Sequence, residues 1–256
     1  MGLFTLAYIV FLVAPILLLM LGSVGEVWTN TLLPAGFTGR WYAEVWADAS
    51  FRRAFVVSVT VCASTCTITA AVGLPLAYAV YGGARRGVRI AARILYLLPI
   101  AAPPLVLGFG FILVFSSDAL PFLGTSWLLV AGHVVLTLPY LMQTLVADMR
   151  HLHLGALERA AESLGAGFVA RFVGIVIPGL RYSLASGLIM VAALSIGEFQ
   201  LSNLIAGFLN RPYPVLLLQA FYGATGFACA ATVVLLLLAL ASGLGAGAGS
   251  RGLSAR

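Results

Sequence analysis

Six long apolar runs dominate the chain and set its expected architecture. They cover residues 3–24, 54–81, 94–115, 127–149, 182–205 and 215–244. A helix needs about 20 mostly apolar residues to cross the hydrocarbon core of a bilayer, and each run meets that length. The first run has no basic segment before it and exceeds the apolar core of a signal peptide, so we expect it to remain as a span. The pattern predicts an all-α, polytopic membrane protein with six transmembrane helices.

The third apolar run is interrupted. Pro99, Pro103 and Pro104 fall within it, and Gly108 follows them. Proline removes a backbone donor, and a helix broken inside a membrane must be satisfied by its neighbours or by water in a cavity. Breaks of this kind often line the pathway of a transporter, and a kink that only aids packing is the alternative. On the first interpretation, Pro103 and Gly108 are candidate pathway residues.

Residues 157–180 form the most polar long segment between two apolar runs. Its apolar residues recur at helical spacing and predict one stripe: Leu157, Ala160, Ala161 and Leu164. Its charged residues are expected to cover the other side: Glu158, Arg159 and Glu162. Gly165 follows the stripe, where a helix commonly ends with a residue at positive φ. A second short helix is expected over residues 168–176, with Pro178 separating it from the next run.

This segment resembles the cytoplasmic loop of permease subunits of binding-protein-dependent ABC importers. The family's motif reads E-A-A, three residues, G, nine residues, I-x-L-P. The chain matches it at five positions: Ala160, Ala161, Gly165, Ile175 and Pro178. Ile177 stands where Leu is usual, and Arg159 stands where Glu is usual, with Glu158 just before it. The resemblance implies a permease subunit with the type I importer fold.

Two further stretches are similar to the spermidine and putrescine permeases of this family. They are GFTGRWY at residues 36–42 and SIGEFQLSNLIAGF at residues 195–208. The resemblance implies a polyamine, or a related small solute, as the substrate. Permeases for 2-aminoethylphosphonate, ferric iron and thiamine share much of the pattern and remain as alternatives.

The resemblance also implies a complex in the bacterial cytoplasmic (inner) membrane. Its other members would be two ABC ATPase subunits, a second permease that is identical or homologous, and a periplasmic or lipid-anchored solute-binding protein. ATP would be bound by the ATPase, and this chain would carry no cofactor. The loop helix would ride in a groove on the ATPase, and the implied coupling residues are Leu157, Glu158, Arg159, Ala160, Ala161, Leu164 and Gly165.

Composition supports a protein whose main solvent is the bilayer. The chain is 62% hydrophobic and 9% charged, whereas an ordinary soluble domain is about 25% charged. The net charge of +6 does not indicate a nucleic-acid partner, because the arginines lie in short loops and not along one face. All 14 basic residues are Arg, and a P-loop requires Lys, so an ATPase would have to be another chain. The three cysteines lie inside apolar runs, which argues against a disulfide framework or a metal site.

The distribution of arginine predicts the orientation. Six spans place both termini on one side, and the positive-inside rule chooses that side. With the termini and residues 82–93 and 150–180 in the cytoplasm, ten arginines lie inside: Arg85, Arg86, Arg89, Arg93, Arg150, Arg159, Arg171, Arg181, Arg251 and Arg256. Four lie outside: Arg40, Arg52, Arg53 and Arg211. Both termini and the loop helix are therefore expected in the cytoplasm.

Glu198 is the only acid well inside an apolar run. A buried carboxylate costs at least roughly 2.5 kcal/mol in a membrane, so it should face a cavity, a partner helix or a cation. Two roles for Glu198 remain open: it could lie on the translocation pathway, or it could form a buried hydrogen bond that holds two spans together. His133 is expected to be buried and hydrogen-bonded. An intramembrane enzyme using His133, Asp148 and Glu198 is the alternative class of function, and the absence of H-E-x-x-H and G-x-S-x-G argues against it.

The chain is expected to divide into three segments. Residues 1–53 hold the first span and a polar, aromatic-rich outer loop. Residues 54–245 form the importer-type transmembrane domain, with five helices and the coupling loop at 150–180. Residues 246–256 are expected to be a flexible cytoplasmic tail because of their Gly- and Ala-rich composition.

Overall fold

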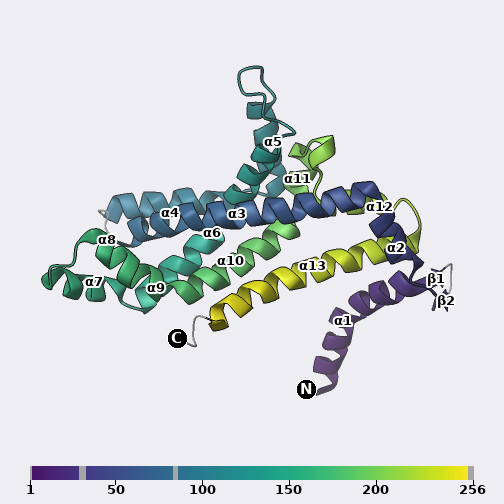
Figure 1. The fold of residues 1–256 in the computed structure, drawn as a ribbon, viewed down its shortest axis with the longest axis horizontal. Coiled ribbons are helices and arrows are strands. Elements are labelled where there is room, and N and C mark those ends of the chain that lie inside the picture. The colour runs from purple at the N-terminus through teal and green to yellow at the C-terminus, as the bar shows by residue number, and fades with distance from the viewer. Residues whose placement is uncertain (1, 29–32, 83–85, 253–256) are drawn as a thin grey trace.

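The computed structural model describes residues 2–28, 33–82 and 86–252 (Figure 1). The helices are α1 Gly2–Val24, α2 Arg40–Ala47, α3 Ala49–Gly82, α4 Arg86–Ala101, α5 Pro104–Phe115, α6 Ser126–His151, α7 Leu154–Ser163, α8 Phe168–Arg171, α9 Ile177–Gly179, α10 Arg181–Ile196, α11 Gln200–Ile205, α12 Tyr213–Ala220 and α13 Thr225–Gly252. A π-helical turn, η1 (Phe172–Val176), joins α8 to α9, and a 3-10 turn, η2 (Phe208–Asn210), follows α11. Two short strands, β1 (Gly25–Val27) and β2 (Ala35–Phe37), pair antiparallel.

The prediction of an all-α, polytopic membrane fold is confirmed. Within the described residues, α1, α3, α6 and α13 are each long and apolar enough to cross a bilayer. Two bent pairs of helices, α4 with α5 and the α8–α9 segment with α10, bring the number of candidate spans to as many as six. The expected spans at residues 3–24, 54–81 and 127–149 correspond to α1, α3 and α6.

The third expected span is not one helix. α4 and α5 meet at an angle of 100° across a break at Ala102 and Pro103. Pro104 opens α5, a position at which the missing N–H leaves no helical hydrogen bond unmade. In Figure 1, α5 stands away from the layer of α3 and α4, with α11 beside it. The prolines therefore turn the chain sharply, whereas the pattern of apolar residues predicted a single interrupted helix.

The predicted limits of the fifth and sixth spans were wrong. The expected helix at 182–205 ends at Ile196, and the chain resumes as α11 at Gln200. The rest of that span's length comes from the segment before it, Phe168–Gly179, which meets α10 at 63°. The expected helix at 215–244 is divided into α12 and α13. Both breaks lie within long, mostly apolar runs, so hydrophobic periodicity does not locate them.

α3 is the central helix and packs along α6 and α10 (Figure 1). The core between them is built mainly from fully buried residues of α6, among them Leu141, Met142, Leu145 and Met149. Gly187 brings α10 directly onto α6, because a Cβ atom there would lie 2.5 Å from Leu141 Cδ1. Small residues at such crossings allow close packing of helices in a membrane.

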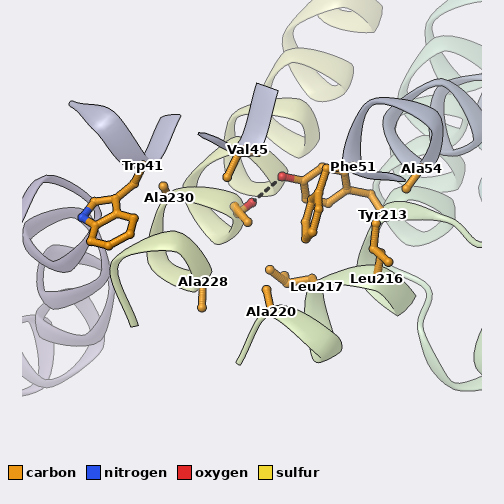
Figure 2. Packing of buried hydrophobic residues seen from close by; sticks show 11 residues of the cluster. Trp41, Val45, Phe51, Ala54, Tyr213, Leu216, Leu217, Ala220, Ala228 and Ala230 are labelled. Carbon is orange, nitrogen blue, oxygen red and sulfur yellow. Dashed lines mark hydrogen bonds between the residues drawn. The ribbon is translucent and has the colours of Figure 1, made fainter. Parts of the chain in front are cut away.

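A second core lies at the opposite end of α3 from α7. Figure 2 shows its aromatic members, Trp41, Phe51 and Tyr213, among small residues of α12 and α13. Trp41 Nε1 donates to the Gly25 carbonyl at 2.8 Å, and the Tyr213 hydroxyl donates to the Ala231 carbonyl at 3.0 Å. Residues 25–53 were expected to form a polar loop. Instead they contain β1, β2 and α2, which bury Trp41 against α13.

The C-terminal part remains helical beyond the expected boundary. α13 continues to Gly252, so residue 246 is not the end of a helix. Residues 253–256, including Arg256, lie outside the described residues, as does Arg85. The flexibility of the tail and its location in the cytoplasm stay predictions.

Candidate functional site

The loop helix forms where the sequence predicts it, and Gly165 ends it. Gly165 has φ +86°, a left-handed conformation that glycine adopts without strain. Its N–H donates to the Glu162 carbonyl at 2.9 Å, and the Ala166 N–H donates to the Ala161 carbonyl at 3.0 Å. This pair of hydrogen bonds is the Schellman arrangement at a helix C-terminus. The predicted end of the helix is confirmed.

One face of α7 points away from the rest of the molecule. Leu157 is 52% exposed and Leu164 is 88% exposed, and the side chains of Arg159 and Ala160 are also exposed. Ala161 is half-buried at the edge of this face. We call Leu157, Ala160, Ala161 and Leu164 the outward stripe of α7. It is an apolar surface on a charged helix, and no other described part of the chain covers it.

The opposite face of α7 is attached to the end of α3. Leu154 is buried there, and Glu158 is only 8% exposed. The Tyr78 hydroxyl donates to Glu158 Oε1 at 2.6 Å. The sequence placed Glu158, Arg159 and Glu162 on the side opposite the stripe, and all three line one open pocket beside the end of α3. The sequence did not predict the burial of Glu158, because its partner Tyr78 is distant along the chain.

The segment after α7 is one continuous helical stretch. The expected helix at 168–176 is present, but it continues through η1 and α9 to Gly179. Pro178 lies at the first turn of α9 and does not separate it from α10. The bend comes at Leu180, two residues later. Glu162 on α7 forms an ion pair with Arg171 of α8, Oε2 to Nη1, at 2.6 Å.

A cavity of about 440 Å³ opens where the α4–α5 break faces the gap between α10 and α11. Its apolar walls come from the proline-containing break and from Leu136 of α6 and Leu194 of α10. Its polar lining comes from α6 and from the α10–α11 region: His133, Thr137, Tyr140, Ser195, Glu198 and Gln200. No arginine is among the residues that line this cavity. The two helix breaks thus create a polar space within an otherwise apolar bundle.

Glu198 lies in the gap before α11 and caps that helix. Oε1 accepts a hydrogen bond from the Leu201 N–H at 2.7 Å, and Oε2 accepts one from the Ser202 N–H at 2.8 Å. Oε2 also accepts from the Ser202 hydroxyl at 2.5 Å. The carboxylate therefore satisfies donors that an α-helix leaves unpaired, and it sits at the positive end of the helix dipole. It still borders the cavity, and its side chain is 10% exposed.

His133 joins α6 to α10 and α11. Its side chain is 1% exposed, with Nδ1 2.8 Å from Ser195 Oγ and Nε2 2.9 Å from Ser202 Oγ. Nε2 also lies 3.8 Å from Glu198 Oε2. The expectation of a buried, hydrogen-bonded histidine is confirmed. His133 and Glu198 share Ser202, so the α10–α11 gap is held by one network.

Pro103 and Gly108, the predicted pathway residues, are not among the residues that line the cavity. Pro103 is the N-cap residue of α5, and its neighbours Ala102 and Pro104 form part of the wall. Gly108 lies against α11, since a Cβ atom there would come within 2.6 Å of Leu204 Cδ1. Pro103 thus lies where α5 begins, and Gly108 lies where α5 packs against α11.

A polar face along α6 was not predicted from the sequence. Its members recur every three or four residues, and they are His133, Thr137, Tyr140, Thr144, Asp148 and His151. The first three line the cavity described above, and the last three line an open groove of about 660 Å³ at the other end of α6. Asp148 accepts a hydrogen bond from the Ser183 hydroxyl in that groove. Helical periodicity of polar residues within an apolar run was the signal that would have found this face.

Comparisons with known proteins relate most of the chain to transport proteins. No family model matches it. It is 28% identical over 232 residues to PhnV of Salmonella typhimurium, named for a 2-aminoethylphosphonate transport system permease, covering 89% of this chain and 85% of PhnV. It is 26% identical over 186 residues to the spermidine/putrescine permease protein PotC of Haemophilus influenzae, covering 73% and 70% of the two chains. The putrescine permease protein PotI of Escherichia coli is 25% identical over 217 residues, covering 82% and 75%.

A solved structure shares the fold. A chain of a bacterial alginate ABC transporter, crystallised with its alginate pentasaccharide-bound periplasmic protein, superposes with a TM-score of 0.78 at 16% identity. The match covers 97% of this chain and 91% of that one. Sequence relatives and fold agree with the motif around Gly165. The chain is a permease subunit of a binding-protein-dependent ABC importer, a multi-pass membrane transport protein and not an enzyme.

Proposed function

We propose that the outward stripe of α7 is the surface on which a separate ATPase docks. The stripe is apolar and exposed, while the other face of α7 is fixed to α3 by Tyr78 and Glu158. A ten-residue helix is marginally stable alone, so both its attachment and its contact surface need partners. The chain has no lysine and therefore no P-loop. ATP would be hydrolysed by the partner, and Leu157, Ala160 and Leu164 would transmit the movement.

We further propose that α7 and both termini lie in the cytoplasm. The ten-to-four distribution of arginines supports this orientation. In Figure 1, α7 lies at the left end of the molecule, and the end of α13 is directed toward that side. The strands, α2 and α12 lie at the right end. The 34 residues of α3 rise about 50 Å at about 1.5 Å each, which is enough to join the two sides of a membrane.

The cavity beside Glu198 and the polar face of α6 are the proposed lining of the solute pathway. The face continues from the cavity to the groove at Asp148, so polar atoms follow the length of one helix. Polar groups inside a membrane are costly unless they face a partner or water. Because Glu198 already caps α11, we assign it mainly to maintaining the break between α10 and α11. Pro103 and Gly108 would keep α5 in place around the same space.

The proposed substrate is a small solute that carries a primary ammonium group. Relatives are named for 2-aminoethylphosphonate and for spermidine or putrescine, and all of these compounds contain such a group. The cavity presents a carboxylate and neutral polar groups, and no arginine lines it. A solute-binding protein would deliver the substrate, and a second permease, identical or homologous, would complete the pathway.

The exposed stripe of α7 is the observation that carries the proposal, and co-purification tests it. We expect Leu164→Glu to abolish recovery of the co-expressed ATPase with the permease in detergent, because a charge would be buried at the interface. Tyr222→Glu is the matched control. Tyr222 is 87% exposed, close to the 88% of Leu164, and lies between α12 and α13, far from α7 (Figure 1). Equal ATPase recovery with both variants would contradict the docking proposal.

A further inference from the structure

The coupling helix is attached to a span with which it has no nearby sequence connection. α7 is joined through the chain to α6, by Leu152 and His153, and to α10, through α8, η1 and α9. α3 is more than 70 positions earlier along the chain, yet its last turns contact α7 at two points. These two contacts join α7 directly to α3.

The first contact lies at the N-terminus of α7. An α-helix leaves its first backbone N–H groups without partners inside the helix. The N-cap residue, His153, has φ +50° and its side chain makes no capping hydrogen bond. Instead, the Gly155 N–H donates to the Tyr81 hydroxyl of α3 at 3.0 Å. α3 therefore supplies a cap that α7 does not supply for itself.

The second contact lies one turn further along α7. The Tyr78 hydroxyl donates to the buried Glu158 carboxylate. The Tyr78 ring also packs edge-on against Phe172 of η1, with 5.2 Å between centroids. The two tyrosines are three residues apart on α3, and their partners are three residues apart on α7 in reverse order. Because the spacings match, the two contacts together restrain α7 from sliding along its axis and from rotating about it relative to α3.

The geometry points to Tyr78 and Tyr81 as positioning residues that make α3 move with the coupling helix. The inference rests on the proposed function, in which an ATPase displaces α7. At its far end α3 is bound to α12, where the Tyr213 N–H donates to Ser58 Oγ at 2.8 Å. Displacement of α7 would thus reach the opposite end of the molecule through one helix.

The chain departs from the family motif at Arg159, next to these contacts. The acid stands one position earlier, at Glu158, where the helix turns it inward. Glu158 therefore binds α3 within this chain, while Arg159 remains exposed beside the outward stripe.

The test uses the complete transporter, with its ATPase and solute-binding protein, in proteoliposomes. Tyr78→Phe combined with Tyr81→Phe removes both hydroxyls and keeps both rings. We expect ATP hydrolysis and ATPase recovery to persist, while the solute imported per ATP falls by at least about tenfold, as expected from losing a hydrogen bond to a buried carboxylate. Tyr42→Phe is the matched control, because it removes a hydroxyl bonded to Ser23 Oγ at 2.7 Å outside this contact.

Conservative replacement separates positioning from simple stabilisation. Glu158→Gln retains an oxygen that accepts from Tyr78 and should retain most of the coupling that Glu158→Ala loses. If the double tyrosine variant assembles poorly, this pair of Glu158 variants gives the same comparison. An unchanged ratio of solute to ATP in the assembled double variant or in Glu158→Ala overturns the inference. A parent complex that binds no ATPase overturns the proposed function instead.

Discussion

Replacing Glu198 with alanine would remove the acceptor of three hydrogen bonds at the start of α11. They come from the Leu201 N–H, the Ser202 N–H and the Ser202 hydroxyl. Loss of an N-cap side chain costs about 0.5–2 kcal/mol, and a buried donor left without a partner costs about 1–3 kcal/mol. Water in the adjacent cavity would satisfy some of these donors. We therefore expect a loss of about 2–3 kcal/mol in total.

The assay is thermal unfolding of the purified transporter, measured together with solute uptake. For a chain of this size a loss of about 2–3 kcal/mol corresponds to a fall in Tm of about 4–12 °C. Glu198→Gln keeps one acceptor oxygen and should lose only about 1 kcal/mol. If the carboxylate also binds the ammonium group of the solute, Glu198→Gln should raise the KM for uptake although its Tm changes little.

A matched control exists at the start of α3. Asp48 Oδ1 accepts from the Ser50 N–H at 2.7 Å and from the Phe51 N–H at 3.1 Å. Asp48→Asn therefore changes an acid to an amide at a helix cap that does not line the cavity, and its KM should stay at the parent value. A Tm for Glu198→Ala within about 1 °C of the parent would refute the capping argument. An unchanged KM for Glu198→Gln would refute the contact with solute.

Two further predictions follow from the packing and from the proposed orientation. Gly187→Val should destabilise the bundle by about 1–3 kcal/mol through overpacking, because its Cβ would lie 2.5 Å from Leu141 Cδ1; thermal unfolding measures this, and Gly110→Val, with no atom within 4 Å of its Cβ, is the control. An equal fall in Tm for both would contradict the close approach of α10 to α6. Ser163→Cys on exposed α7 should resist an impermeant thiol reagent in intact cells and react after permeabilisation. Ready labelling from outside would reverse the proposed orientation.

Several features of this protein follow from its sequence because their causes are local. The apolar runs that become α1, α3 and α6 are long enough to span a bilayer whatever surrounds them. The helix at α7 follows from its 3.6-residue periodicity, and its end follows from Gly165, which adopts positive φ without strain. The importer motif around these residues was sufficient to identify the class of protein.

Only the tertiary structure decided which way the functional side chains face. Glu158 turns inward because Tyr78, 80 positions earlier in the chain, offers it a hydroxyl. Glu198 lies in a break and not inside the expected helix, because its carboxylate caps α11. His133 and Ser202 extend the same hydrogen-bond network to α6 and α10. Trp41, expected in a polar loop, is buried instead, because Gly226 of α13 allows its ring to approach closely. In each case the partner is distant in sequence or lies beyond a break in the helix, and periodicity carries no information about such contacts.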